Sequence, residues 1–441
     1  MNPRKALAAV TLAVTAFFNP PSASAYQPGR YSGRFSFFAQ AAQRDLTGTT
    51  NDTFSELIGT FTLRSTPGDK GGFEFALDTR FAGYPSVEER SQRASIYEAY
   101  AGWSLPGGAL RIRAGQLWLY ELGALGSVAG AAAEARLLKE ENFAPGTPKA
   151  GLFGGLEPEV LNLGYVDGVS KLGGYLNLEA KSGRRHVLGY ANIQNQSLTE
   201  RSVIFFSNYI PVRNSFFIYQ SAEYDLQGPG GQGNSQLTYF FTNVRYSPFR
   251  QVELQGVYHH GISVDTRLIA DSLQAGRPVS EAQLEGFLFE SIGGRLTLRP
   301  WRNFQLFFGY AQDRTRQDEE KRDRLTFGFF SPNLLRSGFD LTVSDTRFNT
   351  AAGSTSDAWY FSLGRNLGRA LYLEAYYRTS VAFLRLSSSG VLVDRRPYSH
   401  LYGLSSVIRI GRRASLLVTL ERTDEDSLDE TRVLSGLSFR F

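Results

Sequence analysis

Apolar and polar side chains alternate along the last ten residues, Arg432 to Phe441, and this alternation constrains the fold more than any other feature of the chain. Successive side chains of an extended strand point to opposite faces. One face would carry Val433, Ser435, Leu437, Phe439 and Phe441, and the other Arg432, Leu434, Gly436, Ser438 and Arg440. An open sheet edge with an apolar face invites aggregation, whereas a closed barrel has no edge. The pattern therefore predicts that this strand pairs with the first one, with lipid on one side and a polar lumen on the other.

The aromatic end of this strand carries a resemblance to a known family. A last amphipathic strand that closes on Phe441 resembles the C-terminal assembly signal of Gram-negative outer-membrane β-barrels. The resemblance implies that Phe439 and Phe441 belong to that signal and that the barrel assembly machinery is a partner. It also implies an outer-membrane location, in contact with membrane lipid.

The first 25 residues have the order of a secretory signal peptide. Arg4 and Lys5 precede an apolar run at 6–18, and the small residues at 23–25 follow. This order predicts export and cleavage before Tyr26. A membrane anchor is disfavoured, because about 13 apolar residues fall short of the ~20 that span a bilayer. Residues 26–441 are then expected to form a single barrel domain.

Composition agrees with a barrel and excludes several classes of protein. The chain has 33 Phe, 22 Tyr and 42% apolar residues, which suits strands that expose alternate side chains to lipid. It has no Cys, which rules out disulfides, a lipid-modified Cys and covalent haem attachment within this chain. A net charge of +5 is too balanced to predict nucleic-acid binding.

From Tyr31 onward, amphipathic runs of about ten residues follow one another, and each has the length of a tilted strand that crosses a bilayer. Short turns, such as 182–184 and 300–302, alternate with longer polar links, such as 263–287. The alternation predicts an all-β fold, a transmembrane antiparallel up-and-down barrel whose termini are both periplasmic. We expect about twenty strands, within a range of roughly 18 to 22.

One segment, residues 118–169, interrupts this rhythm. It holds an Ala-rich piece, 129–138, that suggests a short helix, and several Pro and Gly residues follow. Loops of this length are usually functional or disordered. Its placement as the third outer connection, and its length, resemble the constriction loop of general porins. We therefore expect a long third outer loop that folds into the barrel and narrows it.

Charged residues of both signs are predicted to line the lumen. They are Arg34, Arg64, Glu74, Asp78, Arg80, Glu98, Arg111 and Arg113 on the strands before the loop, and Glu134, Arg136, Glu140 and Glu141 within it. One interpretation is that they create a transverse field that sorts solutes by charge and size. The other is that they form ion pairs that hold the wall and the loop together.

The sequence offers no support for catalysis. The four histidines are not at metal-ligand spacing, and of the adjacent pair His259 is the one predicted to face the lumen. No local pattern proposes a nucleophile with its base. We therefore expect no catalytic site, no metal site, no cofactor and no enzymatic activity. Aromatic residues near strand ends suit interfacial girdles, and a sugar-stacking track in the lumen is the alternative.

These features favour a porin-like channel for the passive diffusion of small hydrophilic solutes. One alternative is a barrel that surrounds a partner, as the porin component of porin-cytochrome conduits surrounds a multihaem cytochrome. Another is a closed structural or adhesin barrel. The sequence leaves open whether the chain forms a homo-oligomer or binds a periplasmic or lumen protein.

Overall fold

The computed structural model describes residues 31–46, 52–68, 70–86, 92–138, 146–159, 163–212, 215–231, 235–315, 321–350, 354–388 and 391–441. The predicted signal peptide, residues 1–25, lies outside these ranges. Within them, no helix combines the length and the apolar character needed to cross a bilayer.

The first strands are β1 (Tyr31–Leu46), β2 (Asp52–Ser65), β3 (Gly72–Gly83), β4 (Arg93–Ser104), β5 (Leu110–Trp118), β6 (Ser127–Arg136), β7 (Thr147–Pro158), β8 (Tyr165–Glu179), β9 (Arg185–Asn195), β10 (Leu198–Val212) and β11 (Phe216–Gln227). The remaining strands are β12 (Gln236–Phe249), β13 (Val252–Ser263), β14 (Phe287–Trp301), β15 (Phe304–Thr315), β16 (Arg322–Ser331), β17 (Phe339–Thr350), β18 (Thr355–Leu367), β19 (Leu371–Ser388), β20 (Val391–Arg395), β21 (Tyr398–Ile410), β22 (Ala414–Glu425) and β23 (Leu428–Arg440). The helical elements are η1 (Pro106–Gly108), η2 (Tyr120–Leu125), η4 (Pro229–Gly231), α2 (Thr266–Gln274), α3 (Glu281–Glu285) and η5 (Leu334–Arg336).

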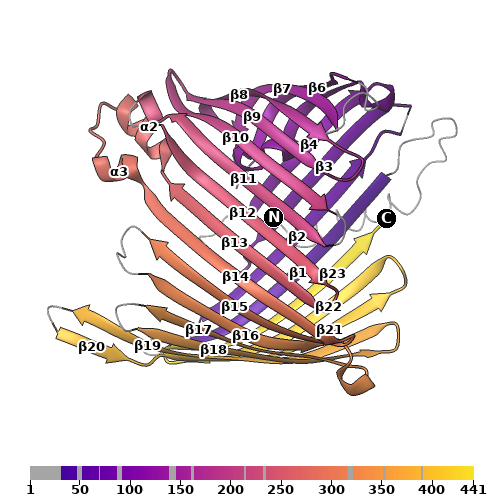
Figure 1. Ribbon diagram of the computed structural model, residues 1–441, viewed down its shortest axis with the longest axis vertical. Coiled ribbons are helices and arrows are strands. Elements are labelled where there is room, and N and C mark those ends of the chain that lie inside the picture. Colours follow the sequence, from indigo (N-terminus) through magenta and orange to yellow (C-terminus); the bar gives the residue numbers. More distant parts are fainter. Residues whose placement is uncertain are drawn as a thin grey trace.

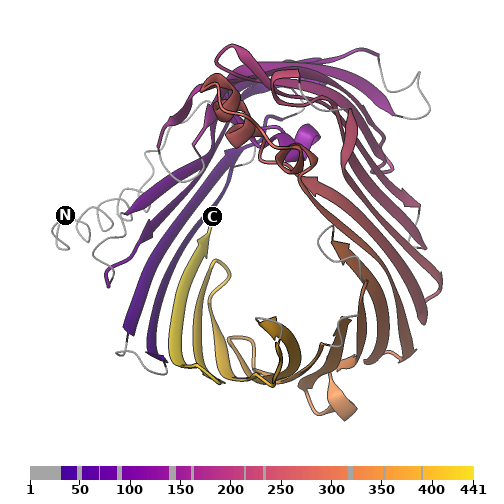
Figure 2. The same ribbon diagram turned by 90° about the vertical axis from the view of Figure 1, so that its left-hand side faces the viewer.

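The strands form one closed antiparallel barrel (Figure 1, Figure 2). Each wall strand pairs with its neighbours in the chain, β19 pairs with β21, and β1 pairs with both β2 and β23. β20 pairs only with the end of β19 among the described residues, so it lies outside the wall. The described chain therefore builds a wall of 22 strands, more than the twenty expected.

The extra wall strands, β6 and β7, lie in the segment 118–169 that was expected to be a loop. Only the eight residues 119–126, which include η2, form the third outer connection. The strands were missed because 10 of their 22 residues are Ala or Gly, which obscure the apolar alternation. Small side chains also suit the close approach of β6 and β7, where a Cβ at Gly130 would lie 2.0 Å from the carbonyl oxygen of Gly154.

The last strand closes the ring as its alternation predicts. The amide of Gly33 donates to the carbonyl of Phe441 at 2.9 Å, and the amide of Phe441 donates to the carbonyl of Gly33 at 3.1 Å. A Cβ on Gly33 would collide with the Phe441 ring, so this glycine makes room for the terminal aromatic side chain. Phe439 pairs with Phe35 in the same register. Their role as an assembly signal stays a prediction.

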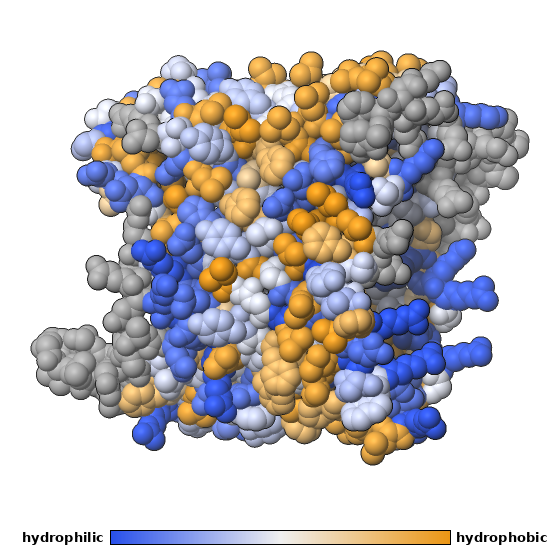
Figure 3. Space-filling model, viewed as in Figure 1, coloured by the Kyte–Doolittle hydropathy of each residue, from blue (hydrophilic) through white to orange (hydrophobic). Residues whose placement is uncertain are grey.

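Apolar side chains occupy the outward face of the wall. Phe81 and Trp103 are about half exposed there, while Glu74 and Glu98 on the opposite face of the same strands are buried. Figure 3 shows hydrophobic side chains interspersed with hydrophilic ones over the middle of one side of the barrel. Asp345 of β17 departs from this pattern, since its register pairs it with the outward residues, and its carboxylate accepts a hydrogen bond from Nε of Arg347 at 3.0 Å. The outward face therefore suits a bilayer over most of its area.

The two ends of the barrel differ, and we name them by their contents. The terminal rim is the end that carries Tyr31, Phe441 and the short turns 180–184, 250–251, 302–303, 332–338, 368–370 and 411–413. The loop rim is the opposite end, with α2 and α3 between β13 and β14. Both ends of the described chain thus lie at the rim with short turns, as the alternation of link lengths predicts.

Candidate channel lumen

A buried ion pair ties β3 to β5 on the lumen face. Glu74 is fully buried, and Nε of Arg111 donates to its Oε1 at 2.6 Å. The pair spans the intervening strand β4 at Gly102, where a Cβ would lie 3.1 Å from that same carboxylate oxygen. Because removal of a buried charge from water is costly, the carboxylate depends on this guanidinium.

A second pair links β2, β4 and the inward connection. Nη2 of Arg64 contacts Oε2 of Glu98 at 2.8 Å and donates to the hydroxyl of Tyr120 at 2.6 Å. Glu98 is almost fully buried. Asp78 lies on the same lumen face, opposite Glu98 and Thr62 in the register of β3 with its two neighbours.

Two of the remaining predicted residues, Glu134 and Arg113, contact tyrosine side chains. Oε2 of Glu134 accepts from the Tyr175 hydroxyl at 2.8 Å, and the buried guanidinium of Arg113 lies 5.7 Å from the centre of the Tyr100 ring. Arg34, Arg80 and Arg136 form no ion pair among the described residues. Glu140 and Glu141 lie outside those residues. The structure therefore brings together six of the predicted charged residues in pairs or ring contacts, and Asp78 shares their face of the wall: Arg64, Glu98, Glu74, Arg111, Arg113 and Glu134.

The connection 119–126 folds into the lumen against this wall (Figure 2). Leu119 and Leu122 are almost fully buried, and a Cβ on Gly189 of β9 would collide with Leu122. Nζ of Lys171 on β8 donates to the carbonyl of Leu125 at 2.8 Å. The connection therefore packs on an apolar part of the lumen face and is fixed at its end by a buried lysine.

Polar contacts from η2 reach two distant strands. Tyr120 contacts Arg64 on β2, and Glu121 accepts from Nη2 of Arg185 on β9 at 3.2 Å. Sequence reasoning predicted an inward third outer connection, but it gave no sign of Tyr100, Tyr120 or Tyr175 as partners of the charges. Tyr120 reaches Arg64 because η2 folds inward, Tyr100 lies on the strand next to that of Arg113, and Tyr175 reaches Glu134 across the intervening strand β7.

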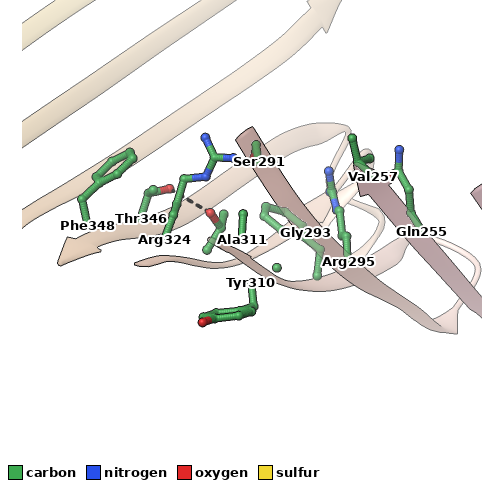
Figure 4. A pocket seen from close by; sticks show the side chains of 14 residues that line it. Gln255, Val257, Ser291, Gly293, Arg295, Tyr310, Ala311, Arg324, Thr346 and Phe348 are labelled. Carbon is green, nitrogen blue, oxygen red and sulfur yellow. Dashed lines mark hydrogen bonds between the residues drawn. The ribbon is translucent and has the colours of Figure 1, made fainter. Parts of the chain in front are cut away.

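The lumen face of β13 to β17 differs from the wall just described. Arg295 and Arg324 lie there beside a cavity of about 440 Å³, and neither forms an ion pair with a described residue. Arg295 lies over the Phe307 ring, 4.3 Å from its centre. Figure 4 shows Gln255, Arg295 and Arg324 on one side of the sheet and Tyr310 on the other. The same alternation that predicted the first wall would have found these arginines, had it been applied to the later strands.

Aromatic rings continue this second wall toward β11. The centre of the His259 ring lies 5.4 Å from the ring centre of Tyr239 and 5.3 Å from that of Phe289. The ring centres of Tyr219 and Phe241 are 5.9 Å apart. His259 faces this lumen cluster, as predicted. Other rings, such as Trp301, lie exposed near the strand ends, and both the interfacial girdle and the sugar-stacking track stay predictions.

Helix α2 anchors the loop rim to strands β7 and β10. Nε of Arg267 contacts Oε2 of Glu200 at 2.6 Å, and its Nη2 contacts Oε2 of Glu157 at 3.2 Å. Burial lowers the pKa of Arg267, but the hydrogen bonds and negative charges of Glu200 and Glu157 together outweigh burial, so the net shift of this pKa is upward. Ile269 of the same helix is almost fully buried. This connection is thus a packed part of the barrel.

The described barrel combines an apolar outward face, a polar inward face and a ring of strands with no free edge. Only a membrane barrel satisfies all three. The described chain folds as a closed antiparallel β-barrel of the transmembrane type. Its lumen has one wall of mutually neutralised charges covered by η2, and a second wall of arginines and rings that η2 leaves uncovered among the described residues.

Three solved structures illustrate what this barrel is similar to. Crystal structures of OccK3 (OpdO) and OpdQ from Pseudomonas aeruginosa align with TM-scores of 0.45 and 0.44, at 8% and 10% identity, over 93% of this chain and 96% and 98% of theirs. OccAB4 from Acinetobacter baumannii aligns with a TM-score of 0.44 at 9% identity, over 94% of this chain and 99% of its own. No family model and no curated protein sequence matches the chain. The function below therefore rests on this chain's own residues.

Proposed function

We propose that this barrel conducts small hydrophilic solutes passively across the outer membrane. The observation that carries the proposal is the unequal lumen. The charges near η2 are paired with one another, whereas Arg295 and Arg324 face the interior without a carboxylate partner among the described residues. A wall of 22 strands also encloses a wider interior than the ~8 strands whose side chains fill the bore.

The free arginines predict the direction of ion selectivity. Paired charges cancel at a distance, so the field in the lumen is set chiefly by the groups that remain unpaired. Arg295 and Arg324 are therefore expected to favour anions over cations. The ring faces beside them, Phe307 and Phe348, add an apolar surface along which a solute can pass.

Single-channel recording in planar bilayers tests both statements. The wild-type protein should give discrete open steps, and its reversal potential in a salt gradient should indicate anion preference. The double variant Arg295→Gln and Arg324→Gln should lower the anion-to-cation permeability ratio roughly twofold or more. The matched control Arg277→Gln, an exposed arginine beyond α2, should leave the ratio unchanged. Equal effects of the two changes would contradict the assignment of the second wall.

The wide lumen that the 22 strands enclose also favours a second candidate function, in which the barrel is a sheath around a partner protein. Known barrels of 22 strands hold a plug in their lumen. A sheath would make the isolated chain either silent or a very large unselective pore, and addition of the partner would change that behaviour. Ordinary open steps that respond to Arg295→Gln decide for the channel.

A further inference from the structure

Arginine recurs at the terminal rim. Between β8 and β22, the described turns at this rim carry Arg184, Arg250, Arg302, Arg336, Arg369, Arg412 and Arg413. The described residues of these turns include no Asp or Glu. At the loop rim, the connection between β13 and β14 alone carries Asp265, Asp271, Glu281 and Glu285. Between β8 and β22, the described turns of the terminal rim therefore carry positive charge alone, whereas the connection at the loop rim mixes these carboxylates with Arg267 and Arg277.

These arginines are available to a partner outside the protein. All seven are exposed, and none forms an ion pair with a described residue. Figure 3 shows hydrophilic side chains that project from the right-hand edge, where the terminal rim lies. The lumen pair of Glu74 and Arg111, by contrast, has its charges matched inside the protein. The rim charge thus has no internal counter-charge among the described residues.

Large apolar side chains stand beside the rim arginines. Phe249 is 68% exposed and precedes Arg250, Trp301 is 69% exposed and precedes Arg302, and Leu335 is 92% exposed and precedes Arg336. In a protein surrounded by water such neighbours would be costly. At a membrane interface, aromatic and apolar groups sit at the edge of the hydrocarbon while arginine reaches the phosphate layer.

In the turn 332–338, such a pair, Leu335 and Arg336, adopts a strained backbone conformation. Leu335 and Arg336 have φ values of 50° and 64°, a left-handed conformation that is unfavourable for residues other than glycine. Glycine or asparagine would form such a turn more easily. The choice of Leu and Arg at these two positions thus points to a role outside the folded chain.

We propose that the terminal rim binds the phosphate groups of anionic phospholipids in the leaflet at that end of the barrel. The planar guanidinium group fits phosphate oxygens with two parallel hydrogen bonds, which a lysine ammonium does not. Repetition on successive turns surrounds part of the rim with such sites, and the apolar neighbours enter the adjacent hydrocarbon. The inference rests on the membrane location of the barrel and is independent of conduction.

Native mass spectrometry of the full-length barrel tests this proposal. The protein is folded into vesicles of phosphatidylcholine with a minor fraction of phosphatidylglycerol, and the lipids retained after extraction are counted. We expect retained lipid to be enriched in phosphatidylglycerol, and the variant Arg250→Gln, Arg302→Gln, Arg336→Gln and Arg369→Gln to lose this enrichment about tenfold. Loop-rim changes Arg277→Gln and Lys321→Gln are the control and should retain it.

Two further measurements on the wild-type protein test the proposal if the variant with four substitutions does not fold. High salt should reduce the enrichment of the wild-type protein, because exposed charge interactions are screened. Free inorganic phosphate at the same ionic strength should reduce it no more than chloride does. No lipid preference in the wild type, equal loss in the loop-rim control, or full competition by free phosphate would each overturn the proposal.

Discussion

Single residues inside the barrel differ in how much the fold depends on them. Arg111 compensates the fully buried Glu74, whereas Arg80 makes no ion pair with a described residue. Arg111→Ala should therefore cost about 3–5 kcal/mol of unfolding free energy, because it leaves a buried carboxylate unpaired. The matched change Arg80→Ala should cost less than about 0.5 kcal/mol. Urea titrations of the refolded protein in detergent, followed by the heat-dependent shift in gel mobility, measure both.

Equal losses from the two arginines would contradict the structure at this scale. The sequence predicted the face of Glu74, Arg111 and Glu98, because alternation alone decides which side of a strand a residue occupies. It could not predict partners. Glu74 and Arg111 lie on strands separated by β4, so their contact depends on strand register and on the small size of Gly102.

At the scale of elements, β6 and β7 depend on close backbone approach. A Cβ at Gly130 would lie 2.0 Å from a neighbouring carbonyl oxygen, while at Gly59 of β2 it would meet no atom within 4 Å. Gly130→Ala should therefore cost about 1–3 kcal/mol through a forced shift of the strands, and Gly59→Ala should be nearly neutral. The fraction of protein that refolds into vesicles, read from gel mobility, reports the difference. A neutral Gly130→Ala would show that this contact is absent.

The same elements show which strands an alternating sequence pattern can predict and which it cannot. Strands with large alternating side chains, such as β1 and β23, were predicted from sequence and are present with the expected faces. β6 and β7 were not, because Ala and Gly carry little information on facing. The inward connection was predicted at the correct point in the chain, but it is much shorter than expected. Its leucines pack on Gly189 and on apolar lumen residues that no local pattern marks as a docking surface.

At the scale of the whole molecule, the central claim is that alternate residues face water on the inside and hydrocarbon on the outside of one closed ring. β16 provides a direct comparison. Arg324 and Thr326 lie beside the lumen cavity, while Leu325 and Phe327 are about half exposed on the other face. Because the chain has no Cys, a single introduced thiol reports its own surroundings without background.

The deciding measurement is the labelling of single-cysteine variants of the membrane-inserted barrel with a small, charged, water-soluble thiol reagent. Thr326→Cys and Arg324→Cys should react at rates typical of thiols in water, and Leu325→Cys and Phe327→Cys should be protected by lipid. Equal labelling along the strand, or protection of the two lumen positions in the isolated chain, would contradict a water-filled barrel.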